Sequence, residues 1–101
     1  MISLVPPIAI KQIADVMTYG ATKYGAHNWT NGIMYSRLLN ALHRHLNSWE
    51  NPYEPDEDSE TGLSHLAHAA CCLCFLLHFE AIGKNYGVNH DLDDRNTPRE
   101  F

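Results

Sequence analysis

Three segments of the chain repeat hydrophobic residues at the spacing of an α-helix. The first segment follows Pro6 and Pro7, which suit the first turn of a helix. Its apolar positions share one helical face: Ile10, Ile13, Ala14, Met17 and Ala21. We therefore expect a helix from about Pro7 to Tyr24. Residues 25–32 follow, and their glycines and asparagines predict a loop.

The clearest pattern predicts a second helix from Tyr35 to Trp49. One face carries an apolar stripe that includes a single histidine: Leu38, Leu39, Leu42, His45, Leu46 and Trp49. The opposite face is polar: Arg37, Asn40, Arg44 and Asn47. A helix of this kind buries its stripe against a neighbour, so His45 is expected to face the interior.

A third helix is expected from about Gly62–Ser64 to Ile82, with Gly83 as its C-cap. It is apolar nearly all round, which predicts burial on most sides, by partner subunits if one domain cannot supply the contacts. The segment before it, NPYEPDEDSETG, contains two prolines and must be a connection. At about a dozen residues it is long, and long connections in compact domains are usually functional or disordered.

These patterns predict an all-α fold, a small bundle of about three main helices in a single domain of residues 1–101. Residues 83–101 have no periodicity and are expected to form an irregular tail. A chain of 101 residues buries only about two-thirds of its unfolded surface. We therefore expect a homo-oligomer to complete the bundle.

Charge and targeting signals narrow the class of protein. The formal net charge of −5 argues against a nucleic-acid partner, because binding a polyanion requires a basic face. The N-terminal MISLVPPIAI lacks the basic region of a signal peptide. The longest apolar run, Leu66 to Phe79, is shorter than the roughly 20 residues of a membrane-spanning helix. A cytoplasmic protein with no membrane partner is expected.

The three cysteines lie together in CCLC, where Cys71 and Cys74 form a C-x-x-C spacing. A thioredoxin-type motif begins a helix after a strand, whereas this one lies within an apolar helical run. A zinc site would need histidines as its other ligands. The simplest interpretation is buried, reduced thiols.

A polar constellation lies at the start of the third predicted helix. Asp56, Glu57, Asp58 and Glu60 crowd the end of the connection. His65 and His68 are three residues apart, so both can point to one place beside the carboxylates. Carboxylates attract hard cations such as Mg²⁺ or Mn²⁺, which bridge to phosphates. The alternative is a solvated acidic segment, stabilised by the helix dipole and capped by Ser59 or Ser64.

Other residues could complete a nucleotide site. Lys23, Arg37 and Arg44 could meet phosphate oxygens, or could be solvated surface charges. Trp29 could stack on a base beside Asn28, or could anchor an interface.

Three segments together resemble the phage and bacterial dATP/dGTP diphosphohydrolase family. They are YGATKYGAHNW (19–29), YSRLLNALHRHLNSW (35–49) and DSETGLSHLAHAACCLCFLL (58–77). The family pattern is roughly G-x-x-K-Y-x-x-x-N-W, then R-H-L-x-x-W, then D-x-E-[ST]-G-x-x-H-L-x-H-A. The resemblance covers about Leu4 to Glu80.

That family is similar to the MazG-like all-α nucleotide pyrophosphohydrolases, which are oligomeric and Mg²⁺-dependent. The resemblance implies hydrolysis of a purine (deoxy)nucleoside triphosphate to the monophosphate and pyrophosphate. It assigns the metal to Asp58, Glu60 and Glu54, with Glu50 a further candidate, and catalysis to Asp58, Glu60 and His65. It assigns substrate binding to six residues: Lys23, Asn28, Trp29, Arg44, His45 and His68.

The chain also departs from the MazG-like pattern. It lacks a clear E-x-x-E in the second helix and has histidines where the third would carry carboxylates. A protein that sequesters a nucleotide or cyclic nucleotide without hydrolysing it is therefore an alternative. An HD-type phosphohydrolase would depend on His90-Asp91, which lies in the aperiodic tail. A purely structural helical protein is the third alternative.

Overall fold

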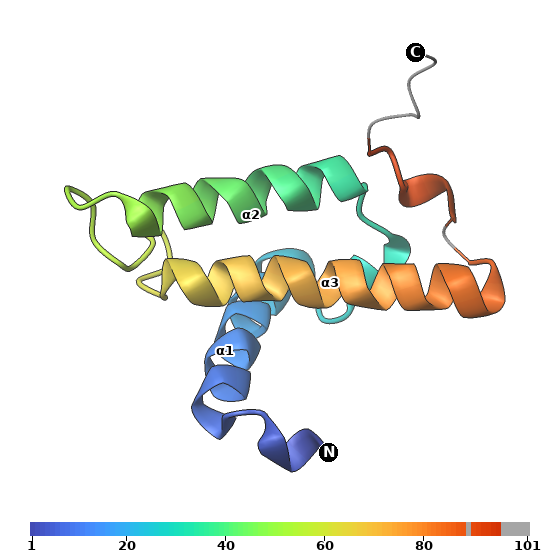
Figure 1. Cartoon of the computed structure of the whole chain (residues 1–101), viewed down its shortest axis with the longest axis horizontal. Coiled ribbons are helices and arrows are strands. Elements are labelled where there is room, and N and C mark those ends of the chain that lie inside the picture. The colour runs from blue at the N-terminus through green and yellow to red at the C-terminus, as the bar shows by residue number, and fades with distance from the viewer. Residues whose placement is uncertain (89, 96–101) are drawn as a thin grey trace.

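Helices α2 (Tyr35–Glu50) and α3 (His65–Tyr86) lie side by side and antiparallel, and α1 (Pro7–Tyr24) crosses the N-terminal half of α3 steeply (Figure 1). The computed structural model describes residues 1–88 and 90–95. Three short 3₁₀ helices complete this part of the chain: η1 (Ile2–Leu4), η2 (Asn28–Asn31) and η3 (His90–Leu92). The all-α prediction is confirmed. Within the described residues, the β-type pairing is an isolated bridge between Glu57 and Ser64.

The predicted bounds of the first two helices are confirmed. Helix α1 spans Pro7–Tyr24 and gives way to Gly25, whose φ of 95° no L-residue adopts easily. Helix α2 spans Tyr35–Glu50, one residue longer than predicted. The segment between them, predicted as a loop, contains the single turn η2.

Helix α3 differs from its prediction at the C-terminal end. Ser64 caps its start, because the Ser64 Oγ accepts a hydrogen bond of 3.1 Å from the N–H of Leu66. The predicted C-cap at Gly83 is wrong, since the helix continues to Tyr86 and Gly87 takes the left-handed conformation at φ 63°. The tail predicted as irregular therefore begins with helix and includes η3. Residues 89 and 96–101 of that tail lie outside the described residues.

The core has two parts that meet on α3. The larger lies between α2 and α3 and contains six buried residues: Tyr35, Leu38, Leu42, Ala69, Cys72 and Phe79. The smaller joins α1 to α3 through Val16, Ala67 and Cys71. The predicted stripe of α2 faces this core as far as Leu46, whereas Trp49 is exposed. α3 is thus the central helix, and its first turns contact both other helices.

Burial of α3 on most sides is not achieved within one chain. Leu66, Leu73 and Leu77 are exposed, Leu77 to 65%. By length and composition α3 could cross a membrane, since it has 22 residues and contains an 18-residue window with a mean hydropathy of 1.6, of which 28% is buried. A groove of about 220 Å³ runs along this face, lined by Tyr35, Leu39, Leu73, Leu76, Leu77, Glu80 and Arg95. The exposed face is the surface on which a partner chain is expected.

Candidate functional site

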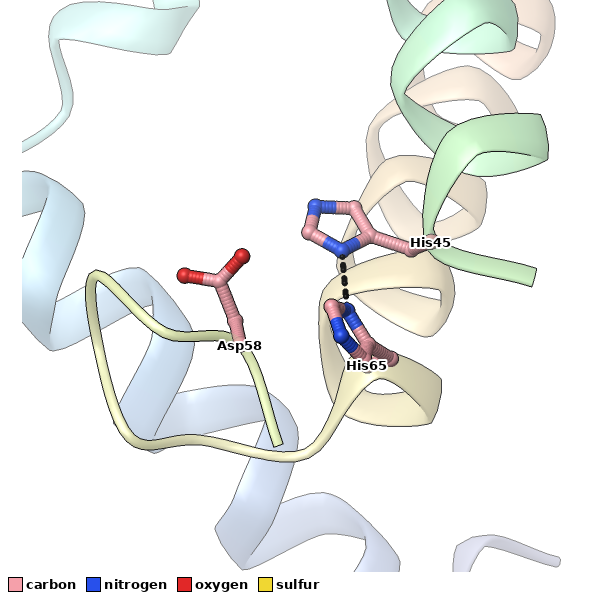
Figure 2. Close-up of side chains that lie close together, drawn as sticks. All are labelled: His45, Asp58 and His65. Carbon is pink, nitrogen blue, oxygen red and sulfur yellow. Dashed lines mark hydrogen bonds between the residues drawn. The ribbon is translucent and has the colours of Figure 1, made fainter. Parts of the chain in front are cut away.

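His45 and His65 meet in the interior between α2 and α3 (Figure 2). Their Nδ1 atoms are 2.9 Å apart, and the residues are only 6% and 8% exposed. The helical stripe turns His45 inward, and the cap at Ser64 starts α3 so that His65 is its first residue. A hydrogen bond between two imidazole nitrogens requires that one donates and the other accepts. The two rings therefore share a single proton across this contact.

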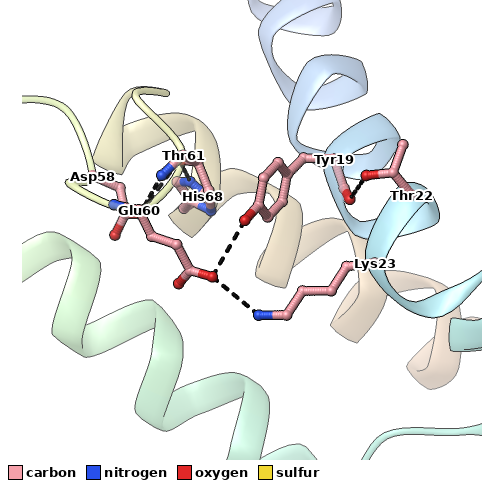
Figure 3. Close-up of polar contacts among 7 residues, drawn as sticks. All are labelled: Tyr19, Thr22, Lys23, Asp58, Glu60, Thr61 and His68. Carbon is pink, nitrogen blue, oxygen red and sulfur yellow. Dashed lines mark hydrogen bonds and ion pairs between the residues drawn. The ribbon is translucent and has the colours of Figure 1, made fainter.

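His68 extends the pair into a group of three imidazoles. Its ring stacks on that of His45, with centroids 4.5 Å apart and an interplanar angle of 9°. The Oγ1 of Thr61 lies 2.7 Å from Nε2 of His68 (Figure 3). His65 and His68 were predicted to share one face of the helix, and both rings contact His45.

The connection before α3 is an ordered turn centred on Asp58. The Oδ2 of Asp58 accepts hydrogen bonds from the backbone N–H groups of Glu60 and Thr61, both at 3.1 Å. The backbone N–H of Gly62 donates to the carbonyl oxygen of Asp58 at 2.7 Å, with Gly62 at φ 71°. The N–H of His65 donates to the carbonyl oxygen of Asp56 at 2.8 Å. These bonds hold the Asp58 carboxylate facing the two histidines (Figure 2).

Burial and charge set the protonation of this group. Burial, together with the charges of His68, Arg44 and His65, lowers the pKa of His45 to about 4. Burial likewise lowers the pKa of His68. Burial alone would raise the pKa of Asp58, but the N–H donors of Thr61 and Glu60 hold it below its usual value. At neutral pH, His45 and His68 are therefore uncharged beside an ionised carboxylate.

A second polar cluster connects α1 to the same turn (Figure 3). Nζ of Lys23 forms an ion pair of 3.0 Å with Oε1 of Glu60, and the hydroxyl of Tyr19 donates to the same oxygen at 3.3 Å. The hydrogen bond from Lys23 lowers the pKa of Glu60, and the bond to Glu60 raises that of Lys23. The carboxylate of Glu60 is thus bound by two side chains of α1.

One set of side chains in the described part of the chain has the arrangement of a metal site. One potential ligand atom from each of His45, Asp58 and His65 lies within 4.8 Å of the other two. Asp58 belongs to the predicted metal ligands, whereas Glu54 and Glu60 are not part of this set. Both glutamates are exposed, as is Glu50. Two nitrogens and one oxygen are a different donor set from the oxygens that Mg²⁺ prefers.

The predicted substrate-binding residues are distributed unevenly around this centre. Arg44 is exposed on α2. Its positive charge helps to lower the pKa values of His45 and His68. Asn28 accepts a hydrogen bond from the Asn31 side chain at 3.2 Å. Trp29 packs instead on the later turns of α3, with its ring centroid 5.1 Å from that of Phe75. Phe75 lies ten residues beyond His65, or about 15 Å along a helix, so Trp29 is not beside the His45–His65 pair.

Two residues that contact the predicted ones were not singled out from the sequence. Thr61 binds His68, and Tyr19 binds Glu60. Both occur in the segments that carry the family pattern, Thr61 at its serine-or-threonine position. That position is the signal that could have identified Thr61.

The cysteines and several other histidines lie outside the group around Asp58. Cys71 and Cys72 are buried free thiols, as predicted, and burial raises the pKa of Cys71 to about 12. His43 is exposed, and His78 is an exposed residue whose ring meets Trp29 edge-on at 4.8 Å. His90-Asp91 begins η3, at the far end of α3 from the histidine group.

Comparison with known proteins agrees with the family pattern. A sequence model of the family described as "dATP/dGTP diphosphohydrolase, N-terminal" matches residues 1–89. A protein of Salmonella phage PMBT28 named dATP/dGTP diphosphohydrolase is 43% identical over 75 residues, 74% of this chain and 25% of that protein. The chain thus matches about a quarter of the length of that relative. No solved structure gives a significant match. Because the family model covers most of the chain, the chain belongs to the dATP/dGTP diphosphohydrolase N-terminal family.

Proposed function

We propose that the chain hydrolyses a purine deoxynucleoside triphosphate, dATP or dGTP, to the monophosphate and pyrophosphate. Membership of the family and the name of the phage relative support this class of reaction. The observation that carries the proposal is the convergence of His45, His65 and His68 beside Asp58. These residues lie in two of the segments that define the family pattern. The group lies in the interior of a small bundle, where polar side chains cost stability unless they are hydrogen-bonded.

Phosphate recognition is assigned to Lys23 and Arg44. Each is exposed and close to the turn or to the histidines. Lys23 is held by Glu60 without a substrate, and an incoming phosphate would compete with that carboxylate for the ammonium group. Arg44 offers a guanidinium that can bind two phosphate oxygens at once. Both charges would stabilise the negative charge that develops on the leaving pyrophosphate.

The chemical step needs a proton acceptor for the attacking water. The water oxygen forms a bond to the α-phosphorus while the bond from that phosphorus to the oxygen bridging to the β-phosphate breaks. We assign the water proton to His68, which is uncharged at neutral pH and adjoins the Thr61 hydroxyl. His65, the residue expected from the resemblance, has its Nδ1 engaged by His45 and is assigned a positioning role. A divalent cation, Mg²⁺ or Mn²⁺, would neutralise triphosphate charge when bound at Asp58.

The test is a product assay on the purified protein with Mg²⁺ or Mn²⁺. Each of the four deoxynucleoside triphosphates is incubated separately, and monophosphate and pyrophosphate are measured by chromatography and by phosphorus NMR. We expect equal amounts of the two products from dATP or dGTP and slower release from the pyrimidine nucleotides. Recovery of tightly bound, intact nucleotide would instead favour the sequestering protein. Neither binding nor turnover of any nucleotide would favour the structural alternative.

A further inference from the structure

We propose that His45, Asp58 and His65 bind a transition-metal ion such as Mn²⁺, Co²⁺ or Zn²⁺, through two imidazole nitrogens and one carboxylate oxygen. This site differs from the all-carboxylate set that the family resemblance implies, since both histidines replace glutamates in it. A role for this metal ion in hydrolysis rests on the proposed function. Binding of the metal ion itself does not depend on any nucleotide.

The separation of the two nitrogens matches neighbouring ligands of one metal ion. The Nδ1 atoms of His45 and His65 lie 2.9 Å apart. Two nitrogens about 2.0–2.1 Å from one metal ion are about 2.9 Å apart when they meet at the right angle of an octahedral ion, and about 3.3 Å apart at the tetrahedral angle usual for zinc. A metal ion between them would take the place of the shared proton. The two helices therefore already bring the nitrogens to the required spacing.

The third ligand comes from a rigid part of the turn. Asp58 presents its carboxylate toward the two rings (Figure 2), and an oxygen of it lies within 4.8 Å of both histidine ligand atoms. The N–H groups of Glu60 and Thr61 bind Oδ2 and fix the orientation of the carboxylate. Closing the site requires the carboxylate to move by at most about 2 Å, because ligand atoms around one metal lie about 3 Å apart.

Neighbouring groups support the ligands as they do in known metal sites. His68 stacks on His45 at 4.5 Å and is itself held by the hydroxyl of Thr61. The backbone of His65 is anchored by its hydrogen bond to the Asp56 carbonyl. Such outer contacts orient ligands and strengthen metal binding. Three protein ligands also leave positions open for water or a phosphate oxygen, as in catalytic sites.

The donor set determines the class of cation. Imidazole favours the later first-row divalent ions over Mg²⁺, and carboxylate accepts either class. Among the ions expected from the sequence, Mn²⁺ is therefore a better match than Mg²⁺. The three cysteines are excluded as ligands here, since none belongs to the set of ligand atoms around Asp58.

The test titrates the tag-free, full chain with Co²⁺ in the absence of nucleotide. Calorimetry and the visible absorption of nitrogen-bound Co²⁺ report affinity and geometry. We expect one Co²⁺ per chain, not displaced by a large excess of Mg²⁺. In D58N and H45Q, binding should weaken by at least the roughly 10- to 100-fold that loss of an outer contact costs. D56N and H43A are matched controls, since the Asp56 side chain and the exposed His43 lie outside the set.

Two results would overturn the site: no Co²⁺ binding by the wild-type chain, or equal binding by D58N, H45Q and the wild type. Circular dichroism checks that each variant is folded. D58N decides the question if H45Q unfolds, because the asparagine oxygen can still accept from the N–H groups of Glu60 and Thr61. Because no nucleotide is present, failure of metal binding and failure of hydrolysis are separate results.

Discussion

Nδ1 of His45 on α2 lies 2.9 Å from Nδ1 of His65, the first residue of α3. This contact joins the inward stripe of one helix to the capped start of the next, and Asp58 faces it from the turn between them (Figure 2). The polar group is therefore part of the packing that holds α2 and α3 together. Changes to it are expected to affect both stability and chemistry.

Burial of His45 should make stability depend on pH. The pKa of His45 falls from 6.5 to about 4 on folding, chiefly through burial. Between these values the unfolded chain binds a proton that the folded chain does not, so lower pH favours unfolding. We expect the melting temperature to be level above pH 6.5 and to fall as the pH drops from 6.5 toward 4. Thermal melts followed by circular dichroism across this range measure it.

Replacement of His45 by glutamine should reduce the fall between pH 6.5 and 4, because glutamine does not titrate, and should leave the part due to His68, whose pKa burial also lowers. H43Q, which changes an exposed histidine of the same helix, should keep the wild-type pH dependence. A wild-type slope in H45Q would show that another group causes the pH dependence. Asp58 and Glu60, whose pKa values are held below 3.8 and 4.5, add their own fall near the acid end of this range in both proteins.

Lys23 should matter for substrate more than for stability. Its ion pair with Glu60 is exposed, and exposed pairs contribute little to the free energy of folding. In K23M we expect a melting temperature close to that of the wild type and a severalfold higher KM for dATP. K11M removes a comparable exposed pair with Asp15 on the same helix and should leave KM unchanged. Equal KM values in the two variants would remove Lys23 from the phosphate site.

Trp29 should stabilise the fold. Its ring packs on Phe75, His78 and Phe79 of α3, and it is partly buried. We expect W29A to lose about 1–3 kcal/mol of unfolding free energy, less than the roughly 3–5 kcal/mol typical of a fully buried aromatic residue. Denaturant unfolding measures the loss. A variant with wild-type stability but a raised KM would instead support the stacking on a base expected from the sequence.

The exposed apolar face of α3 should hold a second copy of the chain. Leu77 is 65% exposed and lines the groove beside Leu73. We expect light scattering to show an oligomer for the wild type and a smaller, still helical species for L77E, because a buried charge opposes association. Y53E places the same charge on an exposed aromatic residue of the connection and serves as the control. A monomeric wild-type protein would contradict this expectation.

The helical periodicity of the sequence was sufficient to predict most of the fold. Helix α1 begins at a proline and ends before a glycine, and helix α2 follows its apolar stripe. These signals are local in the sequence, so the bounds of both helices were predicted closely. The end of α3 was missed because Gly83 resembles a cap. Ile82 packs on the core, the helix continues, and the positive φ falls at Gly87. A glycine is a cap only where the chain turns, and packing decides that position.

The sequence indicated several of the residues that form the site but not which of them contact one another. The stripe placed His45 toward the interior, and the three-residue spacing placed His65 and His68 on one face. The contact of Glu60 with α1 depends on the path of the turn around Gly62, which no spacing rule supplies. The family resemblance grouped Glu60 and Glu54 with Asp58 as metal ligands, whereas the structure groups Asp58 with two histidines.

We propose above that the group around Asp58 carries out the hydrolysis of dATP or dGTP. The most direct measurement is the rate of pyrophosphate release by wild type, D58N and D56N, with folding checked by circular dichroism. We expect loss of most activity in D58N and wild-type activity in D56N, whose altered side chain lies outside the group. Full activity in folded D58N would contradict the proposal.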